Sequence, residues 1–180
     1  GAVSPAMVVD AGCTYVIIGH SERRQHLGET SDMIARKTRA ALRAGLSPIL
    51  CVGETFDERQ RGNRTAILEQ QVSTALQGIE LSGAQALCIA YEPVWAIGTG
   101  HAATPSDVAE AAACIMGTCT STLNAESVQR LEIVYGGSVD PTNVRELLGV
   151  PHISGFLVGT ASQTAARFRN LIAAARAREA

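Results

Sequence analysis

The sequence predicts an α/β fold built on a parallel sheet. Short apolar segments with few charges alternate with longer segments whose apolar residues recur at helical spacing. Strand followed by helix, repeated along the chain, implies parallel strands joined by right-handed crossovers. A doubly wound sheet and a piece of a (β/α)₈ barrel both fit this order. No linker or low-complexity segment divides the sequence, so we expect a single domain over residues 1–180.

Five short apolar segments predict strands that are covered on both faces. They are residues 15–18, 49–52, 87–90, 133–135 and 156–158. Helices are predicted before, between and after them, at residues 5–11, 34–45, 68–79, 107–122 and 163–178, with one more opening at Asp140-Pro141. Gly45 is the expected C-cap of the second helix, and Thr104-Pro105 the expected start of the fourth.

Composition narrows the classes of function. The net charge of -2 does not favour nucleic acid or an anionic membrane as a partner. No apolar run approaches the roughly 18 residues that span a bilayer, and the first residues lack the pattern of a signal peptide. The cysteines lack the two-residue spacing of zinc or redox motifs, which favours buried thiols in a reducing cytoplasm; they are Cys13, Cys51, Cys88, Cys114 and Cys119. We therefore expect a cytoplasmic protein without a metal site.

The loop after the first predicted strand carries a histidine. Residues 19–24 read Gly-His-Ser-Glu-Arg-Arg, and a helix follows. In parallel folds, chemistry is found where strands end. The dipole of the following helix disfavours a charged ring at His20, so a neutral imidazole could donate a hydrogen bond to a substrate. A histidine that only caps the helix fits the same pattern.

The loop after the third predicted strand carries a glutamate. Glu92 is followed by Pro93, Val94 and Trp95, and the loop then becomes rich in small residues. Apolar neighbours would remove water from the carboxylate and make it a stronger base. The proline on one side and the small residues on the other suggest a rigid lid on hinges. A salt-bridged glutamate in an ordinary loop is the alternative.

Glycines follow the last two predicted strands. One strand ends in residues 135–138, Tyr-Gly-Gly-Ser, and the other in residues 158–162, Val-Gly-Thr-Ala-Ser. Exposed backbone N–H groups at a helix N-terminus bind anions, most often phosphate. Two such turns on the last two strands match the usual phosphate position of a (β/α)₈ barrel.

These motifs stand in the order and spacing of one family. The segments 19–24, 90–100 and 135–139 closely resemble triose-phosphate isomerase, and the resemblance runs from Val3 to about Ala175. Another phosphate-binding barrel, such as a synthase of tryptophan or thiamine biosynthesis, lacks the Glu-Pro-Val-Trp sequence. The resemblance implies a partial (β/α)₈ TIM barrel containing five of the eight parallel strands, strands four to eight of the family.

The resemblance also implies a reaction and roles for individual residues. The reaction would be the glycolytic and gluconeogenic interconversion of glyceraldehyde 3-phosphate and dihydroxyacetone phosphate, without cofactor or metal. Glu92 would be the general base, His20 the neutral electrophile, and Glu22 a neighbour in the active site. The first lid hinge would comprise Pro93, Val94 and Trp95. The substrate phosphate would be bound by backbone N–H groups of Gly98, Ser138, Gly159 and Thr160.

The sequence departs from the family pattern at several positions. Thr160 replaces the second of two glycines, and its side chain adds bulk at the phosphate site. His101 stands where a lysine usually follows the lid. Met116 and Ser154 stand where members often pair an arginine with an aspartate, so neither charge is left unpaired.

The largest departure is in length. A full barrel needs about 250 residues, and the segment that carries the family's substrate-binding asparagine and lysine has no counterpart here. Lys37, the only lysine, lies within a predicted helix and cannot replace the missing one. Either the chain is a truncated product or a second polypeptide supplies the rest. We therefore expect a homo-oligomer with poor activity on its own; the alternative function is a non-catalytic fragment that completes a split barrel.

Overall fold

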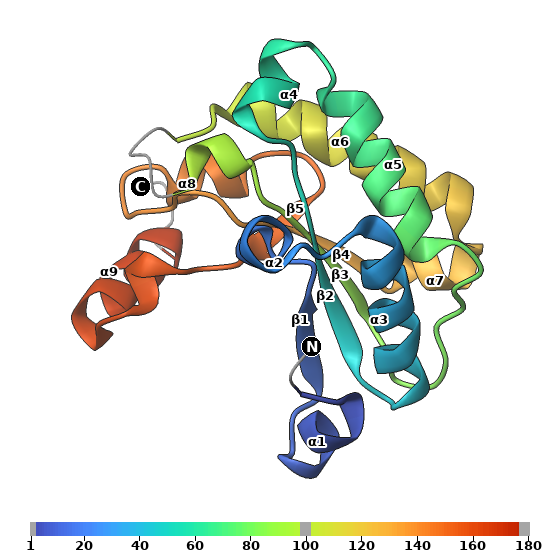
Figure 1. The fold of residues 1–180 in the computed structure, drawn as a ribbon. Helices are drawn as coiled ribbons and strands as arrows, with labels where there is room; N and C mark the ends of the chain where they lie inside the picture. The colour runs from blue at the N-terminus through green and yellow to red at the C-terminus, as the bar shows by residue number, and fades with distance from the viewer. Residues whose placement is uncertain (1–2, 98–101, 177–180) are drawn as a thin grey trace.

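The computed structural model describes residues 3–97 and 102–176 and contains a five-stranded parallel sheet. Its strands pair in sequence order, which decides between the two predicted architectures, because a doubly wound sheet reverses its strand order. The strands are β1 Tyr15–Ile18, β2 Ser47–Val52, β3 Leu87–Tyr91, β4 Leu131–Tyr135 and β5 Ile153–Phe156 (Figure 1).

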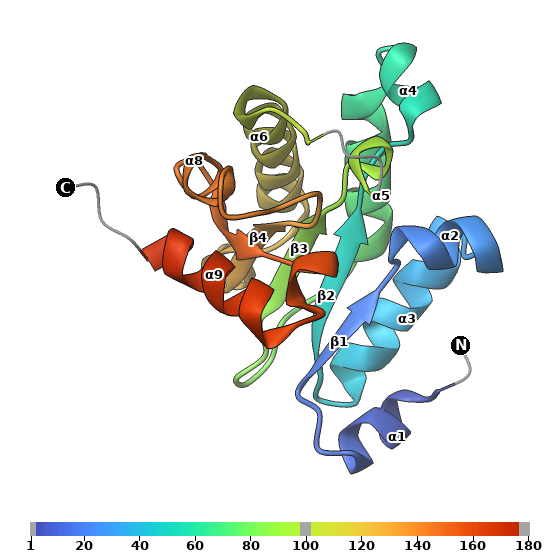
Figure 2. The ribbon, with the colours of Figure 1, turned by 90° about the vertical axis from the view of Figure 1, so that its left-hand side faces the viewer.

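Helices connect consecutive strands and cover the sheet (Figures 1 and 2). The α-helices are α1 Pro5–Asp10, α2 Ser21–Leu27, α3 Ser31–Arg43, α4 Phe56–Gln60, α5 Arg64–Leu76, α6 Pro105–Thr122, α7 Ala125–Gln129, α8 Val144–Leu148 and α9 Ala165–Arg176. Two short 3-10 helices, η1 Val94–Ala96 and η2 Thr160–Ser162, follow β3 and β5. Within the described ranges, no helix is both long and apolar enough to cross a membrane.

The core lies between the sheet and the helices α3, α5 and α6. All five residues of β3, the central strand, are buried, and α5 packs against both α3 and α6. Large side chains from both the sheet and the helices are fully buried. Among them are Leu50 and Ile89 on the strands, and Leu68 and Ile115 on the helices. Burying such side chains is the main stabilising contribution to the fold. The core therefore fixes β2, β3 and β4, the three central strands of the sheet.

Most of the predicted helices and strands are confirmed, although several of their boundaries differ. α3 has its C-cap at Ala44, and Gly45 adopts the left-handed conformation one residue later. The helix expected at Asp140-Pro141 begins only at Val144, because the Asp140 carboxylate accepts the backbone N–H of Thr142 at 2.7 Å and holds a turn there.

The last strand lies earlier than predicted. β5 pairs with β4 from Ile153 to Phe156, across a register shift beside Ile133, and does not extend to residue 158. The Ser154 hydroxyl donates to the Ile133 carbonyl at 3.1 Å at this irregularity. Ser154 therefore has a local structural contact in this chain.

The two outermost strands of the sheet are β1 and β5. Within the described residues, each of these strands pairs with a single neighbour. Tyr15 and Ile17 of β1 are about half exposed, whereas Ile18 is buried. The structure thus confirms the predicted partial barrel of five parallel strands.

Candidate active site

The candidate site lies at the carboxyl ends of β1 and β3. Because the strands are parallel, these ends share one edge of the sheet. Gly19 follows β1 with a φ of 75°, a conformation that favours glycine, and His20 then acts as the N-cap of α2. Glu92 follows β3 directly, and its backbone N–H donates to the Val52 carbonyl at 2.7 Å. The backbone conformation at Gly19 and the backbone hydrogen bond of Glu92 therefore position both residues.

His20 and Glu92, predicted as the catalytic pair, are in direct contact. His20 Nε2 lies 3.1 Å from Glu92 Oε1, and the backbone N–H of Ser21 donates to Glu92 Oε2 at 3.0 Å. His20 Nδ1 accepts the backbone N–H of Glu22 at 3.3 Å. An Nδ1 that accepts a hydrogen bond carries no proton, so a neutral ring has its proton on Nε2, facing Glu92.

Burial has the largest influence on the pKa of the Glu92 carboxyl group. The residue is 2% exposed, and loss of water raises its pKa above the ordinary value. His20, the Ser21 N–H and the Cys51 thiol act in the opposite direction and offset only part of this effect. Burial, followed by the charge of Glu92, raises the pKa of Cys51, which therefore stays a neutral thiol. The result is a carboxylate that binds a proton more readily than an exposed one.

Two glycines allow the chain to approach Glu92 closely. A Cβ at Gly53 would lie 1.7 Å from the Glu92 carbonyl oxygen, and one at Gly136 would lie 2.9 Å from Glu92 Cγ. Gln71 holds the first of these glycines: its side-chain amide accepts from the Gly53 N–H at 3.0 Å and donates to the Gly53 carbonyl at 3.1 Å. Glu92 is therefore enclosed by backbone on two sides, where any larger residue would displace it.

Arg24 connects the ends of the first two strands. Its Nε donates to the Gly19 carbonyl at 2.8 Å, and its Nη2 donates to the Cys51 carbonyl at 3.0 Å. These bonds satisfy two carbonyls at the strand ends. They also place a positive charge near Glu92.

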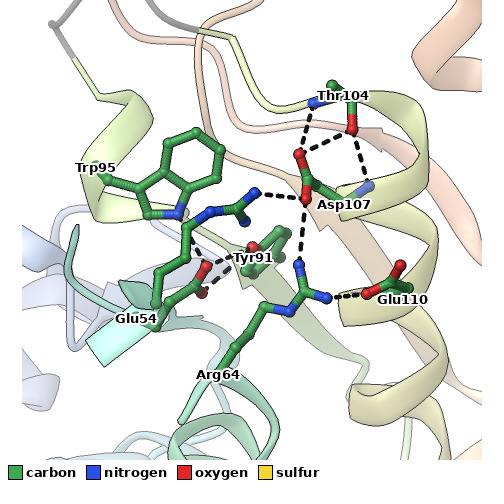
Figure 3. Close-up of polar contacts among 8 residues, drawn as sticks. Glu54, Arg64, Tyr91, Trp95, Thr104, Asp107 and Glu110 are labelled. Carbon is green, nitrogen blue, oxygen red and sulfur yellow. Dashed lines mark hydrogen bonds and ion pairs between the residues drawn. The ribbon is translucent and has the colours of Figure 1, made fainter. Parts of the chain in front are cut away.

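The residues predicted as a lid hinge begin η1, next to a buried carboxylate. Pro93 is buried, while Val94 and Trp95 are half-buried. Trp95 Nε1 donates to Glu54 Oε1 at 2.8 Å. The Tyr91 hydroxyl donates to the same carboxylate, at 3.1 Å from Oε1, and Figure 3 shows both side chains pointing toward Glu54. Glu54 is fully buried and so depends on these two donors.

The predicted phosphate-binding residues lie at the ends of β4 and β5. Ser138 is half-buried, and its carbonyl accepts from the Asn143 side chain at 3.2 Å. Gly159 and Thr160 are exposed at the start of η2. The fourth residue of the predicted set, Gly98, lies outside the described residues. Because β4 and β5 are neighbours, their ends lie side by side at the same edge as Glu92.

Three further predicted positions have different surroundings. The side chain of Glu22 is exposed on α2, so only its backbone takes part in the contact with His20. Lys37 lies on α3 and pairs with Glu29, as expected for a residue remote from the site. Met116 packs against the core from α6. Among residues 3–97 and 102–176, no cluster of His, Cys, Asp or Glu side chains could hold a metal ion.

Sequence reasoning missed Gly53 and Glu54, although both directly follow a predicted strand. The rule that chemistry lies where parallel strands end applies to the end of β2 as it does to β1 and β3. Ser21 was also missed; it is the first residue of a helix, where backbone N–H groups lack partners within the helix. Gly136 was noted only as part of a phosphate motif, because nothing in its local sequence shows that it approaches Glu92.

A sequential parallel sheet with a buried carboxylate at its carboxyl edge defines this chain as an α/β protein of the barrel type. The family model described as triosephosphate isomerase matches residues 1–175. The chain is 48% identical over 172 residues to the triosephosphate isomerase of Carboxydothermus hydrogenoformans, a match that covers 96% of this chain and 68% of that protein. The chain belongs to the triosephosphate isomerase family.

Two further relatives give the same result. The triosephosphate isomerases of Dictyoglomus thermophilum and Chloroflexus aurantiacus are 46% and 49% identical to this chain. Each match covers 96% of this chain and 69% of the relative. The resemblance predicted from the motifs is therefore confirmed, and the chain spans somewhat more than two thirds of the length of these relatives.

Proposed function

We propose that this chain carries the active-site base and electrophile for interconverting glyceraldehyde 3-phosphate and dihydroxyacetone phosphate. The observation that supports this most strongly is the contact between Glu92 and His20, two residues 72 positions apart in the numbering that meet at one edge of the sheet. The roles come from the family resemblance, and the geometry is compatible with them.

In the proposed reaction, Glu92 takes a proton from the carbon next to the substrate carbonyl. The electrons of that C–H bond form a carbon–carbon double bond, and the carbonyl π electrons move to oxygen. His20 donates a hydrogen bond from Nε2 to this oxygen and so stabilises the developing charge of the enediolate. His20 Nε2 passes its proton to this oxygen and takes the proton of the neighbouring hydroxyl, whose oxygen becomes the new carbonyl. Glu92 then returns its proton to the former carbonyl carbon. A raised pKa suits a base that must both accept and release a proton near neutral pH.

We further propose that the substrate phosphate is bound by backbone N–H groups of Ser138, Gly159 and Thr160, together with Gly98. The exposure of Gly159 and Thr160 beside η2 supports this placement, because an anion can reach their N–H groups. The proposal requires no arginine side chain at the phosphate.

Replacing Glu92 by Asp tests the role of the base. The carboxylate would retract by about one methylene, and a misplacement of about 1 Å costs roughly 10²-fold in rate. We expect kcat to fall by about that factor while KM changes little. Steady-state kinetics in both directions measure this. A kcat equal to that of the parent chain would remove Glu92 from the role of base.

A second candidate function is completion of a split barrel without catalysis by this chain alone. Exposed apolar side chains near both edges of the sheet favour it: Tyr15 and Ile17 on β1, and Phe168 and Ile172 on α9. Unpaired strand edges and exposed apolar surface favour association with another polypeptide. We expect the purified chain to self-associate and to turn over substrate poorly.

Light scattering and turnover, measured in parallel, distinguish the two candidates. The purified chain is assayed first alone and then with a polypeptide that carries the first three strands of the family. A rise in turnover together with a change in assembly size would support the split barrel. Full turnover by a monomer without the added polypeptide would contradict it.

A further inference from the structure

Arg59 bridges two segments that lie on either side of residues 98–101. It stands near the end of α4, and its guanidinium carbon lies 4.1 Å from the centre of the Trp95 ring. Its Nη2 donates to Asp107 Oδ1, in the first turn of α6, at 2.7 Å. One side chain thus contacts both η1, which follows Glu92, and the start of α6.

The α6 end of this bridge is firmly held. Asp107 forms a capping box with Thr104: its carboxylate accepts from the Thr104 N–H at 3.1 Å and hydroxyl at 2.8 Å, and its own N–H donates back to that hydroxyl. Arg64 contacts the same Asp107 oxygen at 3.4 Å and also pairs with Glu110 (Figure 3). Asp107 is therefore a rigid attachment point and not a mobile surface group.

The η1 end of the bridge continues to the residues around Glu92. Trp95 donates to Glu54, which also accepts from Tyr91. Tyr91 immediately precedes Glu92, and Trp95 is the third residue after it. Fixing the indole plane therefore restrains the short segment that carries the Glu92 carboxylate.

Stability alone gives little reason for an arginine here. Arg59 Nη1 is buried and has no hydrogen-bond acceptor among the described residues. A buried donor without a partner is unfavourable, and an ion pair that is partly exposed contributes little. What a guanidinium supplies, and an aliphatic side chain lacks, is a planar cation that can stack on an indole and bond to a carboxylate at the same time.

We propose that Arg59 is a positioning residue for Glu92, because it fixes the Trp95 indole of η1 to Asp107 at the start of α6. The proposal rests on the proposed role of Glu92 as the base. Arg59 itself does not contact the carboxylate that would take the proton; it acts through Trp95 and the backbone of residues 91–95.

The single tryptophan of the chain provides a direct readout. Arg59→Gln removes the charge and the stacking cation, so we expect the Trp95 emission to shift to the red and acrylamide quenching to increase. In kinetics we expect kcat to fall by about tenfold, with KM changing less than about twofold, because substrate binding groups are untouched. Arg59→Lys keeps the positive charge and should fold if the first variant does not; lacking the planar group, it should shift the emission in the same direction.

Arg64→Gln is the matched control. It removes the same charge and an ion pair to the same aspartate, whereas Arg59 is the arginine that stacks on Trp95. We expect it to lower stability without moving the Trp95 emission or kcat. Unchanged emission in both Arg59 variants would overturn the proposal, and so would equal changes in emission and kcat for Arg64→Gln. If the parent chain shows no turnover either alone or with the added polypeptide, the proposed function fails, and the emission comparison alone decides whether Arg59 orients Trp95.

Discussion

Replacing Gly136 by alanine tests the placement of Glu92 with a single methyl group. The new Cβ would lie 2.9 Å from Glu92 Cγ and 3.4 Å from the Tyr91 carbonyl oxygen. Carbon atoms in good contact are at least about 3.5 Å apart, so the glutamate side chain must move by roughly 0.6 Å or more. The backbone can stay in place, because the closest atom belongs to a side chain.

This displacement has two measurable consequences. Misplacement of a catalytic group by up to about 1 Å corresponds to a fall in kcat of roughly 10- to 100-fold. Overpacking of this kind costs about 1–3 kcal/mol of stability, which leaves the chain folded if its total stability is ordinary. Initial-rate kinetics and urea unfolding of the same preparation measure both quantities.

Alanine substitutions at two other glycines provide the comparisons for this experiment. Gly155→Ala is the control, because its Cβ would lie 3.7 Å from Val134 Cγ1, an ordinary contact. Gly53→Ala should fail to fold, since its Cβ would lie 1.7 Å from a backbone oxygen that cannot rotate away. If Gly136→Ala keeps the kcat of the Gly155→Ala control, Glu92 does not occupy the position described here.

Three further changes have expected outcomes. Burial raises the pKa of Glu92, so the neutral carboxyl group favours folding at low pH. This contribution is lost as the pH rises through the folded-state pKa. Glu92→Gln should therefore be the more stable form in urea unfolding at neutral pH, and the difference should disappear as the pH falls to about 4, the ordinary pKa of an unfolded glutamate. Gly159→Val has open space for its side chain, because a Cβ there meets nothing within 4 Å. Calorimetry should show weaker binding of a phosphate-bearing inhibitor, and unchanged affinity would count against that phosphate site. Gly117→Ala, in open space on α6, should stabilise the chain by about 1 kcal/mol in thermal unfolding, and a loss of stability would mean that α6 packs differently there.

The sequence was most informative where local pattern and global fold agree. Five apolar segments separated by helical patterns predicted the parallel sheet, and the parallel sheet placed the strand ends on one edge. His20 and Glu92 could be brought together by this reasoning alone, without any side-chain detail. The start of α6 was also predictable, because Thr104 and Pro105 determine it locally.

The remaining features depend on contacts that a linear pattern does not contain. The approach of Gly136 to Glu92 follows from the pairing of β3 with β4, and the contact of Arg59 with Trp95 joins two residues that are 36 positions apart in the sequence. The delayed start of α8 results from competition between the Asp140 side chain and the helix for the same N–H groups. By contrast, α4 was missed although its capping box, Thr55 with Glu58, is readable from the sequence.

In this structure, Glu92 and His20 contact each other directly. Both carboxylate oxygens are occupied, one by His20 Nε2 and the other by the Ser21 N–H, and the imidazole proton that the proposed reaction directs at substrate is directed at the base. A substrate carbonyl that accepts from His20 Nε2 must therefore replace Glu92 as its partner. The carboxylate then loses a favourable contact in a buried site, which raises its proton affinity further. In the proposed mechanism, substrate binding and activation of the base would therefore be one exchange of hydrogen bonds. The buried carboxylate, whose raised pKa costs stability at neutral pH, would serve this exchange.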